Sequence, residues 1–116
     1  MARAESLAQA FAGEKQPTVT GLRNLLEAAI EAQSFNVLVA FVKYQIGRDV
    51  LPLDTGRKLL DRLEEMRGLA KRRETPGGEL QLARYLLAFL YRAFVYEHRL
   101  REQRGRERAE GDGDDR

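Results

Sequence analysis

Apolar residues recur at helical spacing over much of the chain. In residues 18–31 they fall at positions i, i+3, i+4, i+7 and i+8, the pattern of an amphipathic helix with one buried face. Thr18 or Thr20 can cap the start of this helix through its side-chain oxygen. A shorter pattern in residues 1–12 predicts a preceding helix, and Gly13 and Pro17 mark the break between the two. The positions expected to face inward after the break are Leu22, Leu25, Leu26, Ala29 and Ile30.

Residues 35–46 are apolar on nearly every side, and Ser34 can cap them as a helix. Periodicity does not separate a buried helix from a buried strand here, and the β-branched content slightly favours a strand. However, the chain offers no second strand to pair with it, and a lone strand leaves its backbone hydrogen-bonding groups unsatisfied. We therefore predict that this segment is the central buried helix of a bundle, with Gly47 as a candidate C-cap.

Two further helices are predicted in the second half of the chain. Asp54 or Thr55 can cap the first of them. Its expected inward positions are Leu59, Leu60, Leu63, Met66 and Ala70. The sequence TPGG at residues 75–78 is typical of a linker. The last helix is expected from about Glu79 to beyond Arg99, with an inward stripe made of Leu80, Ala83, Leu86, Leu87, Leu90, Ala93 and Phe94.

The apolar pattern stops after Leu100. Residues 101–116 are charged and contain glycines, so we predict that they form a disordered C-terminal tail. Residues 1–100 then form a single helical domain, since a chain of 116 residues has the length of one ordinary domain. The predicted fold class is all-α, a compact bundle of about five helices.

The amino-acid composition limits the cellular compartment that we expect and the kinds of functional site that the protein can have. The chain has no cysteine, which excludes disulfides, thiolate zinc sites and a cysteine nucleophile, and fits a reducing compartment. The sequence shows no signal peptide, and no stretch approaches the apolar length of a membrane span. We therefore expect a cytoplasmic protein.

Positive charge is concentrated in the second half of the chain. Residues 43–73 hold nine cationic against five acidic side chains, and residues 84–106 hold six against two. Sixteen of the twenty cations are arginine, whose planar guanidinium suits phosphate. Genome base composition or a hot habitat would also enrich arginine. The distribution is nevertheless compatible with a surface that binds nucleic acid.

Catalytic and metal-binding constellations are missing from the sequence. The only histidine, His98, has no second histidine or cysteine to act with. Ser6 and Ser34 lack a base, and acidic pairs such as Asp61 and Glu64 fit the polar side of a helix. The glycines at residues 77–78 follow no predicted strand, so they are not a phosphate-binding loop. We expect no catalytic residue, no metal, no cofactor and no enzymatic activity.

Cations beside tyrosines are the remaining candidates for a function. Lys43 and Arg48 flank Tyr44, and arginines recur beside tyrosines in the last helix. Arginine neutralises phosphate, and tyrosine offers an aromatic face. The alternative is that the tyrosines belong to the core and the cations to a solvated face. The candidates for RNA binding from this charge argument are Lys43, Arg48, Arg57, Lys58, Arg62, Arg84 and Arg92.

Three stretches, in the right order, resemble one known family. Residues 18–26 (TVTGLRNLL) are similar to its threonine-rich cap and helix start, and residues 42–49 (VKYQIGRD) to its Tyr-Gln-x-Gly-Arg-acid signature. Residues 80–89 (LQLARYLLAF) resemble the opening of its last helix. The family is the small subunit of type III-A CRISPR effector complexes, the Csm type. The resemblance covers residues 18 to about 98, and its middle motif is the most specific.

The resemblance implies a compact, all-helical, non-catalytic subunit in antiviral defence. Its partners would be guide RNA, target RNA, the backbone subunits, the large polymerase-like subunit and further copies of itself. Its contacts with the guide–target duplex would go to the sugar-phosphate backbone and ignore sequence. Arg23, Arg48 and Arg84 coincide with basic positions of the family motifs, whereas Lys43 falls where other members can be apolar. The charged residues after Leu100 also depart from the family pattern.

Two other classes of function remain open. A helical protein–protein adaptor or homodimerising bundle, with no direct RNA contact, would show an exposed apolar face. A small DNA-binding regulator would need a short helix-turn-helix element. The loop at residues 47–52 is longer than the usual turn of that element, so this alternative is the least favoured.

Overall fold

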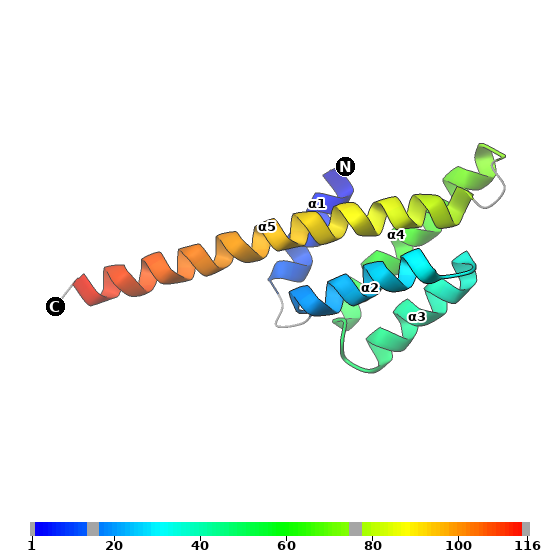
Figure 1. Cartoon of the computed structure of the whole chain (residues 1–116). Helices are drawn as coiled ribbons and strands as arrows, with labels where there is room; N and C mark the ends of the chain where they lie inside the picture. Colours follow the sequence, from blue (N-terminus) through cyan, green and yellow to red (C-terminus); the bar gives the residue numbers. More distant parts are fainter. Residues whose placement is uncertain (1, 14–16, 75–77, 115–116) are drawn as a thin grey trace.

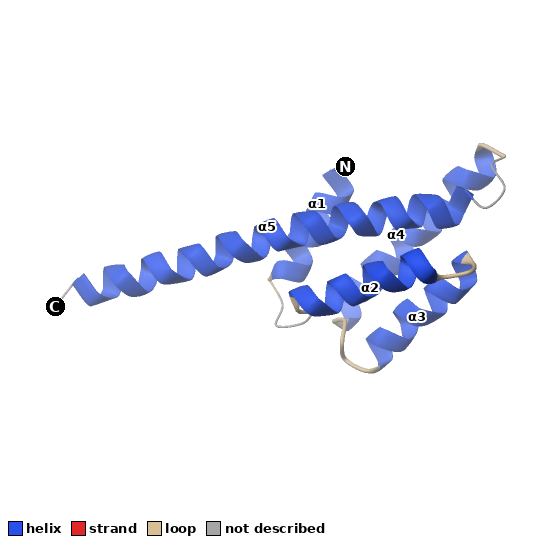
Figure 2. Ribbon diagram, viewed as in Figure 1, coloured by secondary structure: helices blue, strands red, loops and turns tan. Residues whose placement is uncertain are grey.

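The computed structural model describes residues 2–13, 17–74 and 78–114, and these ranges fold into five helices without a strand (Figure 2). The helices are α1 (Ala2–Ala12), α2 (Val19–Glu31), α3 (Phe35–Gly47), α4 (Leu53–Arg72) and α5 (Gly78–Asp114). The predicted all-α bundle of about five helices is confirmed. The predicted linker lies mostly at residues 75–77, outside the described ranges. Within those ranges, no helix is both long and apolar enough to span a membrane.

Helix α5 forms the centre of the bundle (Figure 1). Helices α1, α2 and α4 all pack against it, whereas α3 packs mainly on α4. The prediction that residues 35–46 are the central helix is therefore wrong. Val37 and Tyr44 of α3 are exposed, and its buried side chains are confined to one face. A short apolar helix such as α3 packs only against the helices next to it. The long apolar stripe of α5 can contact three helices at once.

The core is built mainly from leucine and phenylalanine. Most of the predicted inward positions of α2, α4 and α5 are buried, as expected from their spacing. Several others are partly buried, and only Ile30 is exposed, with 58% of its surface accessible. It follows Leu22 by eight residues, which places it about 80° around the helix, at the edge of the apolar stripe. The largest fully buried side chains are Phe11, Leu25, Leu38, Val42, Leu51, Leu59, Leu63, Leu87, Leu90 and Phe94.

Two of the predicted caps are confirmed and one is not. The Thr18 side chain accepts a hydrogen bond from the Gly21 N–H at 3.0 Å, and the Ser34 hydroxyl accepts one from the Val37 N–H at 3.2 Å. Helix α4, by contrast, begins after Pro52, and no side chain caps it. Asp54 and Thr55 lie within its first turn, beyond the capping position.

A left-handed residue follows the C-cap Arg48 of α3, and it is not the predicted Gly47. Asp49 has φ 61°, and its N–H donates to the Ile46 carbonyl at 3.1 Å. The next N–H, of Val50, donates to the Gln45 carbonyl at 3.0 Å. These two bonds form a Schellman motif that satisfies carbonyls at the end of α3. Gly47 is the last residue of α3 itself.

The C-terminal segment is helical, where the sequence predicts a disordered tail. Helix α5 continues to Asp114 and extends past the other helices (Figure 1), and residues 101–110 are all exposed. Arginine, glutamate, glutamine and alanine favour a helix even without packing. A hydrogen bond from Gln103 to Glu107, at 3.2 Å and spacing i, i+4, adds local support. Composition indicated the lack of core contacts but not the backbone conformation.

Candidate nucleic-acid interface

Five of the eight predicted RNA-binding residues lie at one end of the bundle, around the loop that joins α3 to α4. Packing between the helices brings them there. A Cβ on Gly21, near the start of α2, would lie 3.8 Å from Val50 in the loop, so α2 begins beside it. All five side chains are exposed. We call them the loop-end cations: Arg23, Lys43, Arg48, Arg57 and Lys58.

Helices α3 and α4 approach each other closely at the end of the bundle that carries the loop-end cations. A Cβ on Gly56 would lie only 2.6 Å from Cγ1 of Ile46, so only glycine fits there without movement. Gly56 precedes Arg57 and Lys58 directly, and Ile46 is two residues from Arg48. The positions of the loop-end cations on α3 and α4 are therefore coupled through a tightly packed contact.

Arg48 lies over an exposed aromatic ring. Its guanidinium carbon is 5.3 Å from the centre of the Tyr44 ring, and 59% of the tyrosine surface is exposed. The interpretation of Tyr44 as a core residue is therefore wrong, because this tyrosine faces solvent beside a cation. Arginine and an aromatic face together can contact a sugar-phosphate backbone and stack on a base.

The charge balance at this end is positive. Residues 43–58 contain Lys43, Arg48, Arg57 and Lys58 against the two carboxylates Asp49 and Asp54. Arg23 of α2 adds to this excess. Lysine and arginine side chains that extend into solvent can approach phosphates without breaking an existing ion pair.

Arg84 is engaged within the protein. Its Nε donates to the Ala29 carbonyl at 2.9 Å, and its Nη2 donates to the carbonyls of Ile30 at 3.0 Å and Ala32 at 3.2 Å. These carbonyls lie at the C-terminal end of α2, where the helix itself leaves acceptors without partners. Arg84 of α5 thus caps α2, and the loop-end cations lie around the opposite end of that helix.

The other two predicted residues also lie apart from the loop end. Arg62 forms an ion pair with Glu65 at 2.7 Å on the surface of α4. Arg92 lies on α5 and lines a hollow to which Glu5 and Glu97 also contribute. The structure therefore brings together five of the eight predicted residues and leaves Arg62, Arg84 and Arg92 elsewhere.

His98 has an ordinary surface environment on α5. Its Nε2 lies 3.1 Å from a carboxylate oxygen of Glu102, and its ring stacks on Phe94. Among the residues that the structure describes, no group of three histidine, cysteine, aspartate or glutamate side chains could hold a metal ion.

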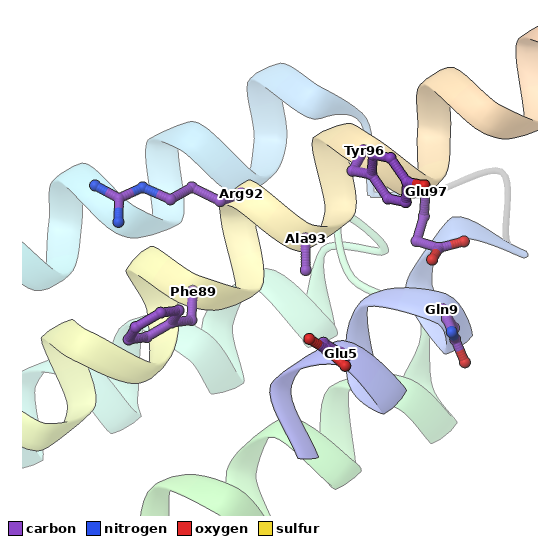
Figure 3. Close-up of a pocket in the computed structure, with 7 residues that line it drawn as sticks. All are labelled: Glu5, Gln9, Phe89, Arg92, Ala93, Tyr96 and Glu97. Atoms are coloured by element: carbon purple, nitrogen blue, oxygen red, sulfur yellow. The ribbon is translucent and has the colours of Figure 1, made fainter. Parts of the chain in front are cut away.

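Sequence reasoning missed a hollow between α1 and α5 (Figure 3). Its volume is about 430 Å³, and Tyr96 and Phe89 are exposed on its α5 side by 63% and 45%. Carboxylates from both helices line it. The exposed aromatics Tyr85, Phe89 and Tyr96 follow each other at intervals of four and seven residues, outside the inward stripe of α5. That spacing is visible in the sequence and could have revealed the hollow's aromatic side.

Arg67 was also missed as a structural residue. Its guanidinium carbon lies 4.5 Å from the centre of the Phe35 ring, and its Nη2 donates to the Asn36 side chain at 2.8 Å. These interactions fasten α4 to the start of α3. Because the partners are more than thirty residues apart, no local sequence signal indicates the pairing.

Comparison with protein-family models, with curated proteins and with solved structures finds no match to this chain. Support for a function therefore comes from the sequence motifs and from the surface chemistry of the loop end.

Proposed function

We propose that the protein is a non-catalytic small subunit of a type III-A CRISPR–Cas interference complex. In this role it contacts the duplex of guide RNA and target RNA through the sugar-phosphate backbone and stabilises target binding in antiviral defence. Its partners are the two RNAs, the backbone subunits, the large polymerase-like subunit and further copies of itself. The proposal begins from the three ordered motifs that resemble this family.

The gathering of the loop-end cations is the structural observation that supports the proposal. The motif at residues 42–49 places Lys43, Tyr44 and Arg48 at this end, and the helix packing adds Arg23, Arg57 and Lys58. Exposed cations with few carboxylates among them suit a sequence-independent interaction with phosphates. Arg84, although it belongs to a family-like motif, is assigned to capping α2 and not to RNA.

A salt titration of RNA binding tests the proposal. The triple variant Arg48→Ala/Arg57→Ala/Lys58→Ala removes three loop-end cations, and Lys71→Ala/Arg72→Ala removes exposed cations at the opposite end of α4 as a control. For the triple variant, the log–log salt slope should fall by about 0.7–0.9 for each phosphate that the protein no longer neutralises. The control should retain the original slope.

Two RNA duplexes of unrelated sequence should bind the unmodified protein with the same affinity, because phosphate groups carry no sequence information. If the triple variant and the control kept the same affinity and slope, the loop end would not be the RNA-binding surface. A strong preference for one sequence would contradict binding through the sugar-phosphate backbone.

A protein–protein adaptor is the second candidate, favoured by a separate observation. Tyr85, Phe89 and Tyr96 are exposed on α5, away from the loop end. Aromatic side chains are enriched at protein interfaces. Assembly with protein partners that persists after reversal of the loop-end charges, without any RNA, would favour this candidate over the first.

A further inference from the structure

The hollow between α1 and α5 combines aromatic rings with uncompensated carboxylates. Glu5 and Gln9 of α1 form one wall, and Phe89, Tyr96 and Glu97 of α5 form the other (Figure 3). Among the side chains that the structure describes, neither Glu5 nor Glu97 has an ion-pair partner. The hollow is therefore a local acidic site on a chain whose net charge is +2.

The one cation among the lining residues does not neutralise this site. Arg92 extends along α5, and its guanidinium points away from both Glu5 and Glu97 (Figure 3). The small side chain of Ala93 lies between the two aromatic positions and leaves room for a ligand. The aromatic rings are reachable from solvent, since Phe89 and Tyr96 are both exposed.

We propose that this hollow binds the guanidinium group of an arginine side chain presented by a protein partner. A guanidinium is planar and positively charged, so it can stack on an aromatic face and donate paired hydrogen bonds to a carboxylate. This hollow contains both aromatic faces and carboxylates. A phosphate or an RNA strand is disfavoured here, because Glu5 and Glu97 would repel it. The proposal does not depend on the RNA-binding role of the loop end.

A titration of the full chain with N-acetyl-arginine amide, followed by amide chemical shifts, tests the proposal. The matched ligands are the citrulline derivative, which is a neutral analogue of nearly the same shape, and the lysine derivative, which keeps the charge without the planar group. Saturable shifts are expected for residues that line the hollow. The citrulline derivative should cause none, and the lysine derivative should bind more weakly than arginine.

Variants of the chain locate the site. Glu5→Gln and Glu97→Gln should each weaken arginine binding by about threefold to tenfold, as expected for partly exposed charge-assisted hydrogen bonds. Ala93→Leu should also weaken it, because the larger side chain fills the hollow while every charge is kept. Glu27→Gln removes an exposed carboxylate on α2 and should leave the affinity unchanged.

Three outcomes would overturn the proposal. They are shifts scattered over the whole surface, equal binding of the citrulline or lysine derivative, and an unchanged affinity in both glutamine variants. The same amide signals could also shift when only the protein concentration is raised, without added ligand. If that shift were smaller in Glu97→Gln, the arginine would come from a second copy of the chain. That result would support the site and identify its partner.

Discussion

Replacing Arg84 should destabilise the fold without affecting the RNA binding that we propose for the loop end. Its guanidinium makes three hydrogen bonds, of 2.9, 3.0 and 3.2 Å, to carbonyls at the end of α2. The helix does not satisfy these acceptors itself, because the last N–H that bonds back, that of Ala32, goes to Ala28. Arg84 also places a positive charge at the negative end of the helix dipole.

The expected cost of Arg84→Met follows from these hydrogen bonds. A hydrogen bond with a charged donor contributes about 1.5–3 kcal/mol. Water can reach the partly exposed end of α2 and replace much of the loss, so the three bonds together are worth about one such bond. The favourable interaction with the helix dipole adds about 0.5 kcal/mol. We therefore expect the free energy of unfolding to fall by about 2–3.5 kcal/mol, since methionine keeps the packing of the aliphatic part.

Urea unfolding followed by far-ultraviolet circular dichroism measures this loss as a lower transition midpoint with an unchanged m value. Arg99→Met is the matched control, because Arg99 is an exposed arginine on the same helix, and its effect should stay within about 0.5 kcal/mol. A similar small effect for Arg84→Met would refute the capping role. Under conditions in which the variant is folded, the salt slope of RNA binding should be the same for Arg84→Met as for the unmodified protein. A lower slope would instead show that Arg84 contributes to RNA binding.

Three further perturbations test other parts of the structure. Gly56→Ala should destabilise the protein by about 1–3 kcal/mol because its Cβ overlaps α3, whereas Gly105→Ala, with open space around it, should be neutral or stabilising in thermal unfolding. Asp49→Gly should raise the free energy of unfolding by about 0.5–1 kcal/mol, since glycine adopts a positive φ without strain; a loss of stability would contradict the left-handed cap. Truncation after Leu100 should reduce the helical circular dichroism signal but leave the denaturant midpoint nearly unchanged, because residues 101–110 are all exposed; an unchanged signal would show that this segment is not helical in solution.

Local patterns predicted the helices and most of the core. Apolar spacing identified Leu59 and Leu63 as buried residues of α4, and side-chain chemistry identified Thr18 and Ser34 as caps. These features depend on residues within one or two helical turns of each other, so a sequence contains the information directly.

The arrangement of the helices could not be predicted in the same way. An apolar segment such as residues 35–46 indicates burial, but which helix is central depends on how many neighbours each one contacts. The role of Arg84 depends on carbonyls more than fifty residues earlier in the chain. A basic motif residue can therefore be identified from sequence and still serve the fold, because its partner is determined only by tertiary packing.

The candidate site was predicted in part. Charge and motifs selected all five loop-end cations, but they also selected Arg62, which pairs with Glu65, and Arg92, which lies at the α1–α5 hollow. Sequence shows where cations occur and not which carboxylates face them. The hollow itself needs two helices that are about ninety residues apart, so only half of its lining could be recognised from the spacing of aromatics on α5.

Co-purification from the native host tests the central claim most directly. The tagged chain would be isolated under gentle conditions, and its associated RNA and proteins would be identified. We predict recovery of short guide RNAs together with a large polymerase-like protein and repeated backbone subunits. Recovery of the chain alone, or with unrelated proteins and no RNA, would contradict its assignment to a type III-A CRISPR complex.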